Sequence, residues 1–277
     1  MYYSEDEARS LVIEAGHRLL NTGLIARTWG NISARISNDE FIITPSGMAY
    51  DTLLPEELVK VNANDLSYDG EIKPSSEKGI HAVAYILRPE IDFIIHTHQF
   101  YASVVGVEGK DTPHAAAADY ALPGTDKLKT KLMKAISQNP DKVAFLMQKH
   151  GALCLGTSYE DAFDIADKLE KECEDIFKSY VGEIENNDYI SACAVQRKRL
   201  LPYIDDFAQI LGSSVMLNRS VDEICSGEDS EAQKMILEKN CAAALYAKVR
   251  KADPLGVVDA NLQRYIYLNK YSKLKKK

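Results

Sequence analysis

Short apolar stretches and helical stretches alternate along the first 180 residues of this chain, and no other feature restricts its fold as much. Ser4 with Glu7, and Ser158 with Asp161, have the spacing of helix N-terminal caps, and Ser76 is a candidate cap for a further helix. Six short stretches have the apolar, β-branched character of strands: 31–36, 41–44, 58–62, 92–98, 143–147 and 152–155. This alternation predicts a layered α/β domain.

The pattern changes near residue 183. Helical apolar periodicity recurs through 204–211 and 232–249, with few strand signals between these stretches. We therefore expect two parts, a main domain at 1–182 and a mostly helical C-terminal extension at 183–277.

Composition excludes several classes of function. The 277 residues carry a formal net charge of −8, which argues against nucleic acid or an anionic membrane as the main partner. An anionic substrate stays compatible with this charge, because backbone N–H groups can bind phosphate locally. No apolar run approaches about 18 residues, and the first ten residues are polar and acidic. The five cysteines contain no C-x-x-C pair. We expect a soluble, cytoplasmic protein.

Two histidines stand at the end of the expected strand 92–98. His96 and His98 are two residues apart, so on a strand both imidazoles would project from one face and could converge on an ion. His150, which precedes Gly151, is a candidate third ligand. Three protein ligands would leave Zn²⁺ an open catalytic position. The alternative is a set of half-exposed strand histidines that bind nothing.

Glu77 lies at the start of an expected helix. A glutamate there is often only a favourable partner of the helix dipole. Near a metal-bound carbonyl group, however, it would be placed to take a proton from carbon as a general base. His81 lies four residues later on the same helix face and is a candidate supporting partner.

Small residues form three clusters that resemble anion-binding turns. Backbone N–H groups and short hydroxyl side chains can hold a phosphate without large basic residues. The clusters are Thr28-Trp29-Gly30-Asn31, Thr44-Pro45-Ser46-Gly47 and Ser75-Ser76. Each alone is more often just a turn, but three beside a metal-ligand pattern indicate a phosphorylated substrate.

These motifs, in this order, resemble the class II aldolase and adducin family, and within it the fuculose-phosphate aldolase branch. The resemblance spans about residues 5–180 and implies a three-layer α/β/α fold, a homotetramer with active sites between subunits, and one zinc ion per subunit. The matching series is Gly30-Asn31-Ile32-Ser33, Thr44-Pro45-Ser46-Gly47, Pro74-Ser75-Ser76-Glu77, His96-Thr97-His98 and His150-Gly151.

The resemblance also implies roles for single residues. Zinc would be held by His96, His98 and His150, with Glu77 as the base and a candidate fourth ligand. Tyr120, shortly before a Gly-Thr pair, matches the proton-donating tyrosine that a neighbouring subunit contributes. The implied reaction cleaves a phosphorylated ketose, similar to fuculose 1-phosphate, into dihydroxyacetone phosphate and a short aldehyde. The residues that would hold the substrate phosphate are Thr28, Gly30, Asn31, Ser46, Gly47, Ser75 and Ser76.

Other interpretations stay open at this point. A ribulose-5-phosphate 4-epimerase shares the zinc site but uses an aspartate where Tyr120 falls, and Asp119 is adjacent. A non-catalytic, adducin-like scaffold typically loses the metal histidines, which this chain keeps. A metal-dependent hydrolase would not explain the three anion clusters. The chain departs from the family pattern in Lys149, where a histidine or asparagine often precedes the third ligand, and in its long C-terminal extension.

Overall fold

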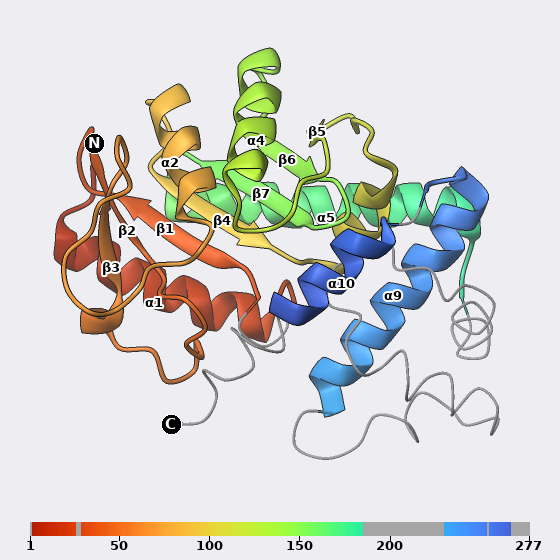
Figure 1. Ribbon diagram of the computed structural model, residues 1–277, viewed down its shortest axis with the longest axis horizontal. Helices are drawn as coiled ribbons and strands as arrows, with labels where there is room; N and C mark the ends of the chain where they lie inside the picture. The colour runs from red at the N-terminus through yellow and green to blue at the C-terminus, as the bar shows by residue number, and fades with distance from the viewer. Residues whose placement is uncertain (1, 26–28, 185–229, 254, 267–277) are drawn as a thin grey trace.

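The computed structural model describes residues 2–25, 29–184, 230–253 and 255–266. A seven-stranded sheet in the order β3-β2-β1-β4-β7-β6-β5 crosses the molecule (Figure 1). Neighbouring strands are antiparallel except β5 and β6, which are parallel. The strands are β1 (Asn31–Arg35), β2 (Glu40–Ile43), β3 (Val59–Asn62), β4 (Phe93–Thr97), β5 (Ala115–Ala118), β6 (Ala144–Met147) and β7 (Gly151–Gly156).

Helices cover both faces of this sheet. One hydrophobic cluster joins α1, α3 and α5 to one face, and a second cluster joins α2 and α4 to the other. The predicted three-layer α/β/α fold is confirmed. The helices are α1 (Glu5–Asn21), α2 (Lys78–Leu87), α3 (Phe100–Val105), α4 (Asp126–Gln138), α5 (Tyr159–Val181), α9 (Ser230–Arg250) and α10 (Val257–Ile266), with single 3₁₀ turns η1 (Pro55–Glu57) and η2 (Gly106–Glu108).

The extension contributes α9, which packs on α3 and α5 outside the three layers (Figure 1). Arg250 near its end makes two hydrogen bonds to Glu108, at 2.8 and 2.9 Å, and covers the ring of Tyr180 at 4.1 Å. Because α9 spans Ser230–Arg250, the helical pattern predicted at 232–249 is confirmed. The pattern at 204–211 lies outside the described residues, and the domain division at 183 stays a prediction.

Two of the three predicted helix caps are confirmed. Ser4 accepts the Glu7 N–H at 3.3 Å, and Ser158 accepts the Asp161 N–H at 3.2 Å. The prediction for Ser76 is wrong, because α2 begins one residue later with Glu77 as its N-cap residue and without a side-chain cap. Ser75, rather than Ser76, accepts the Glu77 N–H at 3.2 Å, and this bond shapes the turn before α2.

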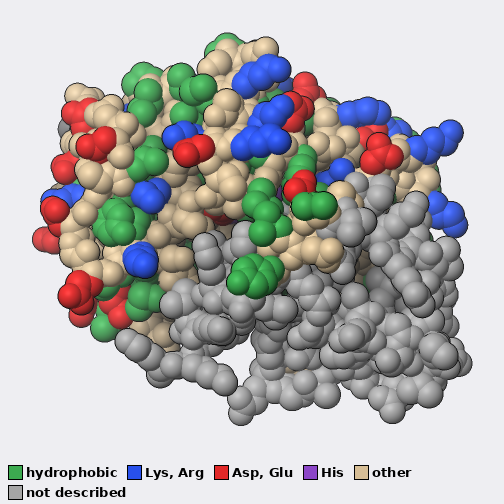
Figure 2. Space-filling model, in the orientation of Figure 1, with side chains coloured by type: hydrophobic (Ala, Val, Ile, Leu, Met, Phe, Trp, Pro, Cys, Tyr) green, Lys and Arg blue, Asp and Glu red, His purple; other side chains and the backbone are tan. Residues whose placement is uncertain are grey.

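Among the described residues, no helix has both the length and the apolar character that a bilayer crossing requires. A cytoplasmic location stays a prediction. Acidic and basic side chains are interspersed over the described part of the face shown in Figure 2. Neither sign of charge dominates that face.

Candidate metal centre

Three neighbouring central strands, β1, β4 and β7, bring the candidate ligands together at their ends. Asn31, at the start of β1, pairs with His96 near the end of β4. Because β4 and β7 are also antiparallel, the end of β4 lies beside the start of β7. His98 directly follows β4, and His150 directly precedes β7. The topology therefore places these side chains together.

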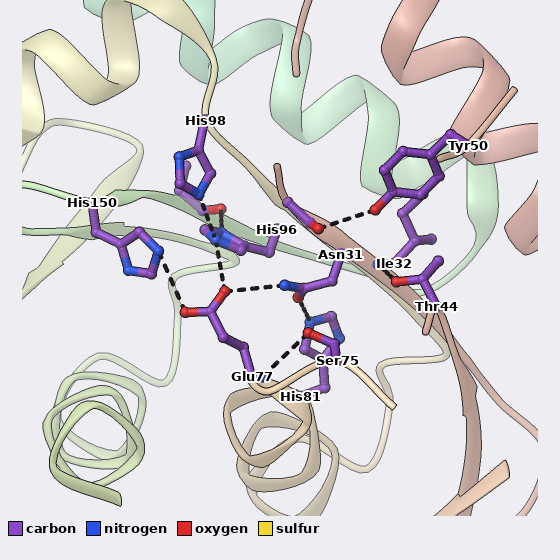
Figure 3. A network of polar contacts seen from close by, with 12 residues as sticks. Asn31, Ile32, Thr44, Tyr50, Ser75, Glu77, His81, His96, His98 and His150 are labelled. Carbon is purple, nitrogen blue, oxygen red and sulfur yellow. Dashed lines mark hydrogen bonds and ion pairs between the residues drawn. The ribbon is translucent and has the colours of Figure 1, made fainter. Parts of the chain in front are cut away.

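The three predicted ligands, His96, His98 and His150, meet as a buried group (Figure 3). One ligand atom of each lies within 4.8 Å of the others. Their ring centroids are 4.8 to 5.0 Å apart, and the Nε2 atoms of His96 and His98 are separated by 3.1 Å. Three imidazoles at this spacing form a group that could hold one metal ion.

The hydrogen bonds of these imidazoles fit a metal site. His96 Nδ1 lies 2.8 Å from the Ala152 carbonyl oxygen, which can only accept, so Nε2 keeps its lone pair for the group. His150 is buried, and neither of its nitrogens is hydrogen-bonded within the described part of the chain. Its Nε2 faces Glu77 Oε1 at 3.4 Å, and that oxygen is also without a hydrogen bond. Buried polar atoms without partners are unfavourable, and a bound cation would give a partner to His150 Nε2 and to Glu77 Oε1.

Glu77 directs its carboxylate into the same group. Its Oε2 lies 3.3 Å from His96 Nε2, and its Oε1 faces His150 (Figure 3). Burial raises the pKa of Glu77, but its interactions with His150 and His96 and the hydrogen bond from Asn31 outweigh this effect, so the pKa is lowered. An ionised carboxylate can bind a cation or accept a proton.

The electrostatics keep two of the histidines neutral. Burial lowers the pKa of His150 to about 4, although Glu77 opposes this shift. Burial also lowers the pKa of His98 well below its usual value, with the neighbouring His96, His150 and Lys239 acting in the same direction. The neutral imidazole is the form that binds metal, so His98 and His150 are ready to act as ligands at neutral pH.

Buried polar side chains support Glu77 from the sheet and from α2 (Figure 3). Asn31 Nδ2 donates to Glu77 Oε2 at 3.0 Å, so its Oδ1 accepts from His81 Nε2 at 2.5 Å. The other ring nitrogen of His81, Nδ1, lies 2.7 Å from Ser33 Oγ, and Ser33 Oγ lies 2.8 Å from Tyr85 Oη. Burial lowers the pKa of His81 to about 3, so it is neutral. The partnership expected between His81 and Glu77 therefore runs through Asn31.

Two glycines allow the backbones to approach at the centre. Gly151 follows His150, and a Cβ atom there would lie 2.3 Å from the Thr97 carbonyl oxygen. Gly30 has a φ of +94°, and a Cβ atom there would lie 2.5 Å from the His96 carbonyl oxygen. Any larger residue would push apart the strands that carry the imidazoles.

The predicted anion clusters lie next to one another beside Glu77. The Ser75 N–H donates to the Thr44 carbonyl oxygen at 3.0 Å, and the Ser46 N–H donates to that of Lys73 at 2.9 Å. Both N–H groups are hydrogen-bonded to carbonyl oxygens of the protein. Of these two serines, only the hydroxyl groups can therefore donate to an anion. Gly47 adopts a left-handed φ of +75° in the same turn. Thr28 lies outside the described residues.

Tyr120 lies just after β5, near the turn that carries His150. Its N–H donates to Gln148 Oε1 at 3.1 Å, and the Lys149 ammonium lies 6.0 Å from its ring centroid. The loop that follows Tyr120 reaches the third anion cluster, because a Cβ atom on Gly124 would lie 3.2 Å from Ser76 Oγ. Tyr120 therefore lies beside the turn that carries His150.

Sequence reasoning missed Lys239 of α9. This side chain is buried, and its Nζ donates to the His98 carbonyl oxygen at 2.6 Å. Burial lowers its pKa to about 8, with Glu170 opposing the shift, so it still carries its proton at neutral pH. The available signal was its helical spacing, because Lys239 follows Ile236 by three residues and precedes Ala243 by four.

Comparison with known families supports the arrangement. The profile of the family described as "Class II Aldolase and Adducin N-terminal domain" matches residues 10–176. The chain belongs to this family. The predicted family membership and the predicted class of enzyme, a class II aldolase, are confirmed.

Several members of the family are similar to this chain. The 5-deoxy-D-ribulose 1-phosphate aldolase of Bacillus thuringiensis is 30% identical over 176 residues, which cover 58% of this chain and 80% of the relative. The L-fuculose phosphate aldolase of Escherichia coli K12 is 29% identical over 171 residues, 57% of this chain and 77% of the relative.

Solved structures of the family show the same fold. One, titled L-fuculose 1-phosphate aldolase, is 30% identical, with a TM-score of 0.57 over 64% of this chain and 86% of that one. The L-fuculose 1-phosphate aldolase of Glaciozyma antarctica is 16% identical but covers 90% of this chain and 95% of its own, with a TM-score of 0.54. That fold similarity extends beyond the part of this chain that the two sequence relatives cover.

Proposed function

We propose that this chain is a zinc-dependent aldolase that cleaves a phosphorylated ketose, similar to fuculose 1-phosphate, into dihydroxyacetone phosphate and a short aldehyde. One observation carries this proposal: three buried imidazoles converge with the ionised carboxylate of Glu77, 3.3 Å from His96 and 3.4 Å from His150. The family membership and the names of the relatives support the same class of reaction.

Zinc is the proposed metal, one ion per subunit. Three imidazole ligands and a nearby carboxylate are typical of Zn²⁺ sites with an open position for substrate. His96, His98 and His150 would hold the ion, with Glu77 as a candidate fourth ligand. When bound, the metal supplies a Lewis acid for negative charge that develops on the ketose oxygens.

Two side chains would move the protons of the reaction. Cleavage breaks a carbon–carbon bond, and the electron pair stays with the dihydroxyacetone fragment. Glu77 would carry the proton that this fragment gains at carbon, since Asn31 holds its carboxylate toward the centre. Tyr120, contributed to the neighbouring subunit's site, would carry the proton of the hydroxyl oxygen that becomes the aldehyde.

The anion clusters would hold the substrate phosphate and so align the bond that breaks. Ser46, Gly47, Ser75 and Ser76 would contribute from the turns beside Glu77, and Gly30 and Asn31 from the start of β1 and the residue before it. Thr28 is part of the same proposal. A homotetramer with sites between subunits is the proposed assembly, as the resemblance to the fuculose-phosphate aldolase branch implies.

A 4-epimerase is the main competitor, and one contact weighs against it. Asp119, the aspartate that such an enzyme would use, forms a 2.7 Å ion pair with Lys131 on α4. The N–H of the adjacent Tyr120 is held by Gln148. Because the Asp119 carboxylate is engaged by Lys131, Tyr120 is the acid that we favour at this position.

The test is to incubate the zinc-loaded protein with dihydroxyacetone phosphate and a panel of short aldehydes, and to identify the products by mass spectrometry and NMR. The proposal expects new ketose phosphates and their cleavage in the reverse direction. Interconversion of ribulose 5-phosphate and xylulose 5-phosphate without net condensation would indicate the epimerase. No turnover of either kind by zinc-loaded protein would reject both activities.

A further inference from the structure

The C-terminal extension places a buried cation against the backbone of a proposed metal ligand. Lys239 on α9 is 4% exposed, and its Nζ donates to the His98 carbonyl oxygen at 2.6 Å. The same Nζ lies 5.9 Å from the ring centroid of Trp29, and that ring lies 6.1 Å from the ring of His98. Burying an ammonium group is costly, so this contact is not a casual feature of the packing.

An opposite charge holds the other side of the same turn. Glu170 on α5 accepts the N–H groups of Tyr101 at 2.7 Å and of Ala102 at 3.0 Å. These are first-turn N–H groups of α3, where a carboxylate satisfies unpaired donors and interacts favourably with the helix dipole. Gln99, which lies between β4 and α3, donates from its side chain to the Ala166 carbonyl oxygen on α5 at 2.9 Å.

His98 itself lies beyond the hydrogen-bonded ladder of the sheet. The last register pair between β4 and β7 joins Thr97 to Ala152, so the sheet does not fix the next residue. Lys239 binds the carbonyl side of the segment 98–102, and Glu170 binds its amide side. The charges of Lys239 and Glu170 also attract each other. Helices from the second half of the chain thus hold the turn that begins with His98.

We propose that Lys239 is a positioning residue that fixes His98 for metal binding, so that α9 of the C-terminal extension completes the metal centre. This inference rests on the proposed metal site. Lys239 acts through the backbone of His98 and needs no contact with the substrate. Loss of its ammonium would leave the His98 carbonyl group without this donor and free the turn to shift the imidazole.

The test compares Lys239→Met with the wild-type protein, using Zn²⁺ affinity measured by competition with a chelator. Groups that orient metal ligands are worth roughly 10- to 100-fold in metal affinity, and a loss of this size is expected. The absorption spectrum of the Co²⁺-loaded protein should also change, because it reports the ligand geometry. Lys239→Arg, which keeps a donor, should recover most of the affinity. Lys248→Met, at an exposed lysine of the same helix, is the matched control and should behave as wild type.

A folded Lys239→Met protein with wild-type affinity and an unchanged Co²⁺ spectrum would overturn the inference. If the Met variant does not fold, Lys239→Gln replaces it, because Gln is too short to reach the carbonyl oxygen in the same geometry. A folded Gln variant with wild-type affinity would then reject the positioning role, and a weakened one would support it. Failure of the wild-type protein to bind metal would instead reject the proposed function.

Discussion

Asn31 donates from its amide nitrogen to Glu77 Oε2 at 3.0 Å, while its amide oxygen accepts from His81. This bond fixes which oxygen of Glu77 is held by the sheet, and it leaves Oε1 facing His150. The orientation of the proposed base therefore depends on Asn31, and the orientation of Asn31 depends on His81. The proposed phosphate contact would add a second role to the same residue.

Replacing Asn31 with Ala should lower turnover about 10- to 100-fold, because a hydrogen bond to a charged group is worth about 1.5–3 kcal/mol. Zinc should stay bound, since the three imidazoles are unchanged. Cleavage kinetics and metal content measured on one preparation separate these effects. Asn64→Ala is the control, at an exposed asparagine that bonds to Asp39. Wild-type turnover in the Asn31 variant would contradict the role given to this amide.

Replacing Glu77 with Gln should abolish measurable cleavage. Loss of a general acid–base group typically costs about 10²- to 10⁴-fold, and Gln can neither deliver the proton to carbon in cleavage nor accept it in the reverse reaction. Gln keeps the shape of the side chain, so zinc should remain bound through the imidazoles. Turnover and zinc content are compared with those of Glu71→Gln, a substitution at an exposed residue. Unchanged turnover with Gln at position 77 would remove this residue as the base.

Replacing Tyr120 with Phe should slow the two halves of the reaction unequally. Processing of the aldehyde should fall more than exchange of the dihydroxyacetone proton, because only the aldehyde oxygen depends on the phenol. Deuterium incorporation into dihydroxyacetone phosphate, followed by NMR, measures the second half alone. Equal losses in both halves would reject the assignment of Tyr120.

Replacing Gly151 with Ala should disturb the fold and the metal site together. A Cβ atom would lie 2.3 Å from the Thr97 carbonyl oxygen and 3.2 Å from the His96 ring. Overpacking of this kind costs about 1–3 kcal/mol of unfolding free energy, which urea titration measures. Gly256→Ala is the control, because nothing lies within 4 Å of its Cβ position. Equal stability and zinc affinity in the two variants would show that β4 and β7 tolerate the added methyl group.

The sequence predicts much of the fold because most elements carry their own local signals. The strand β5, Ala115–Ala118, has no such signal, since four alanines do not favour a strand. Its parallel pairing with β6 decides its conformation, and that pairing is tertiary. The helix α4 was missed although Thr125 caps it, and Leu128 and Leu132 follow at helical spacing. That helix could have been found from the sequence.

In the candidate site, too, some features follow from local sequence patterns and others depend on tertiary packing. The spacing of His96 and His98 on one strand was enough to predict that their side chains share a face. The bond between Asn31 and Glu77 joins β1 to the start of α2, so it depends on packing that no local pattern contains. Lys239 follows His98 by 141 residues, and only the folded chain shows that they touch.

Zinc K-edge X-ray absorption on the purified, zinc-loaded protein tests the central claim most directly, because it reports what binds the ion. We predict one zinc per chain with three imidazole nitrogens at about 2.0–2.1 Å, the usual Zn–N distance. Zinc that binds without imidazole ligands, or a protein that takes up no zinc, would contradict the account.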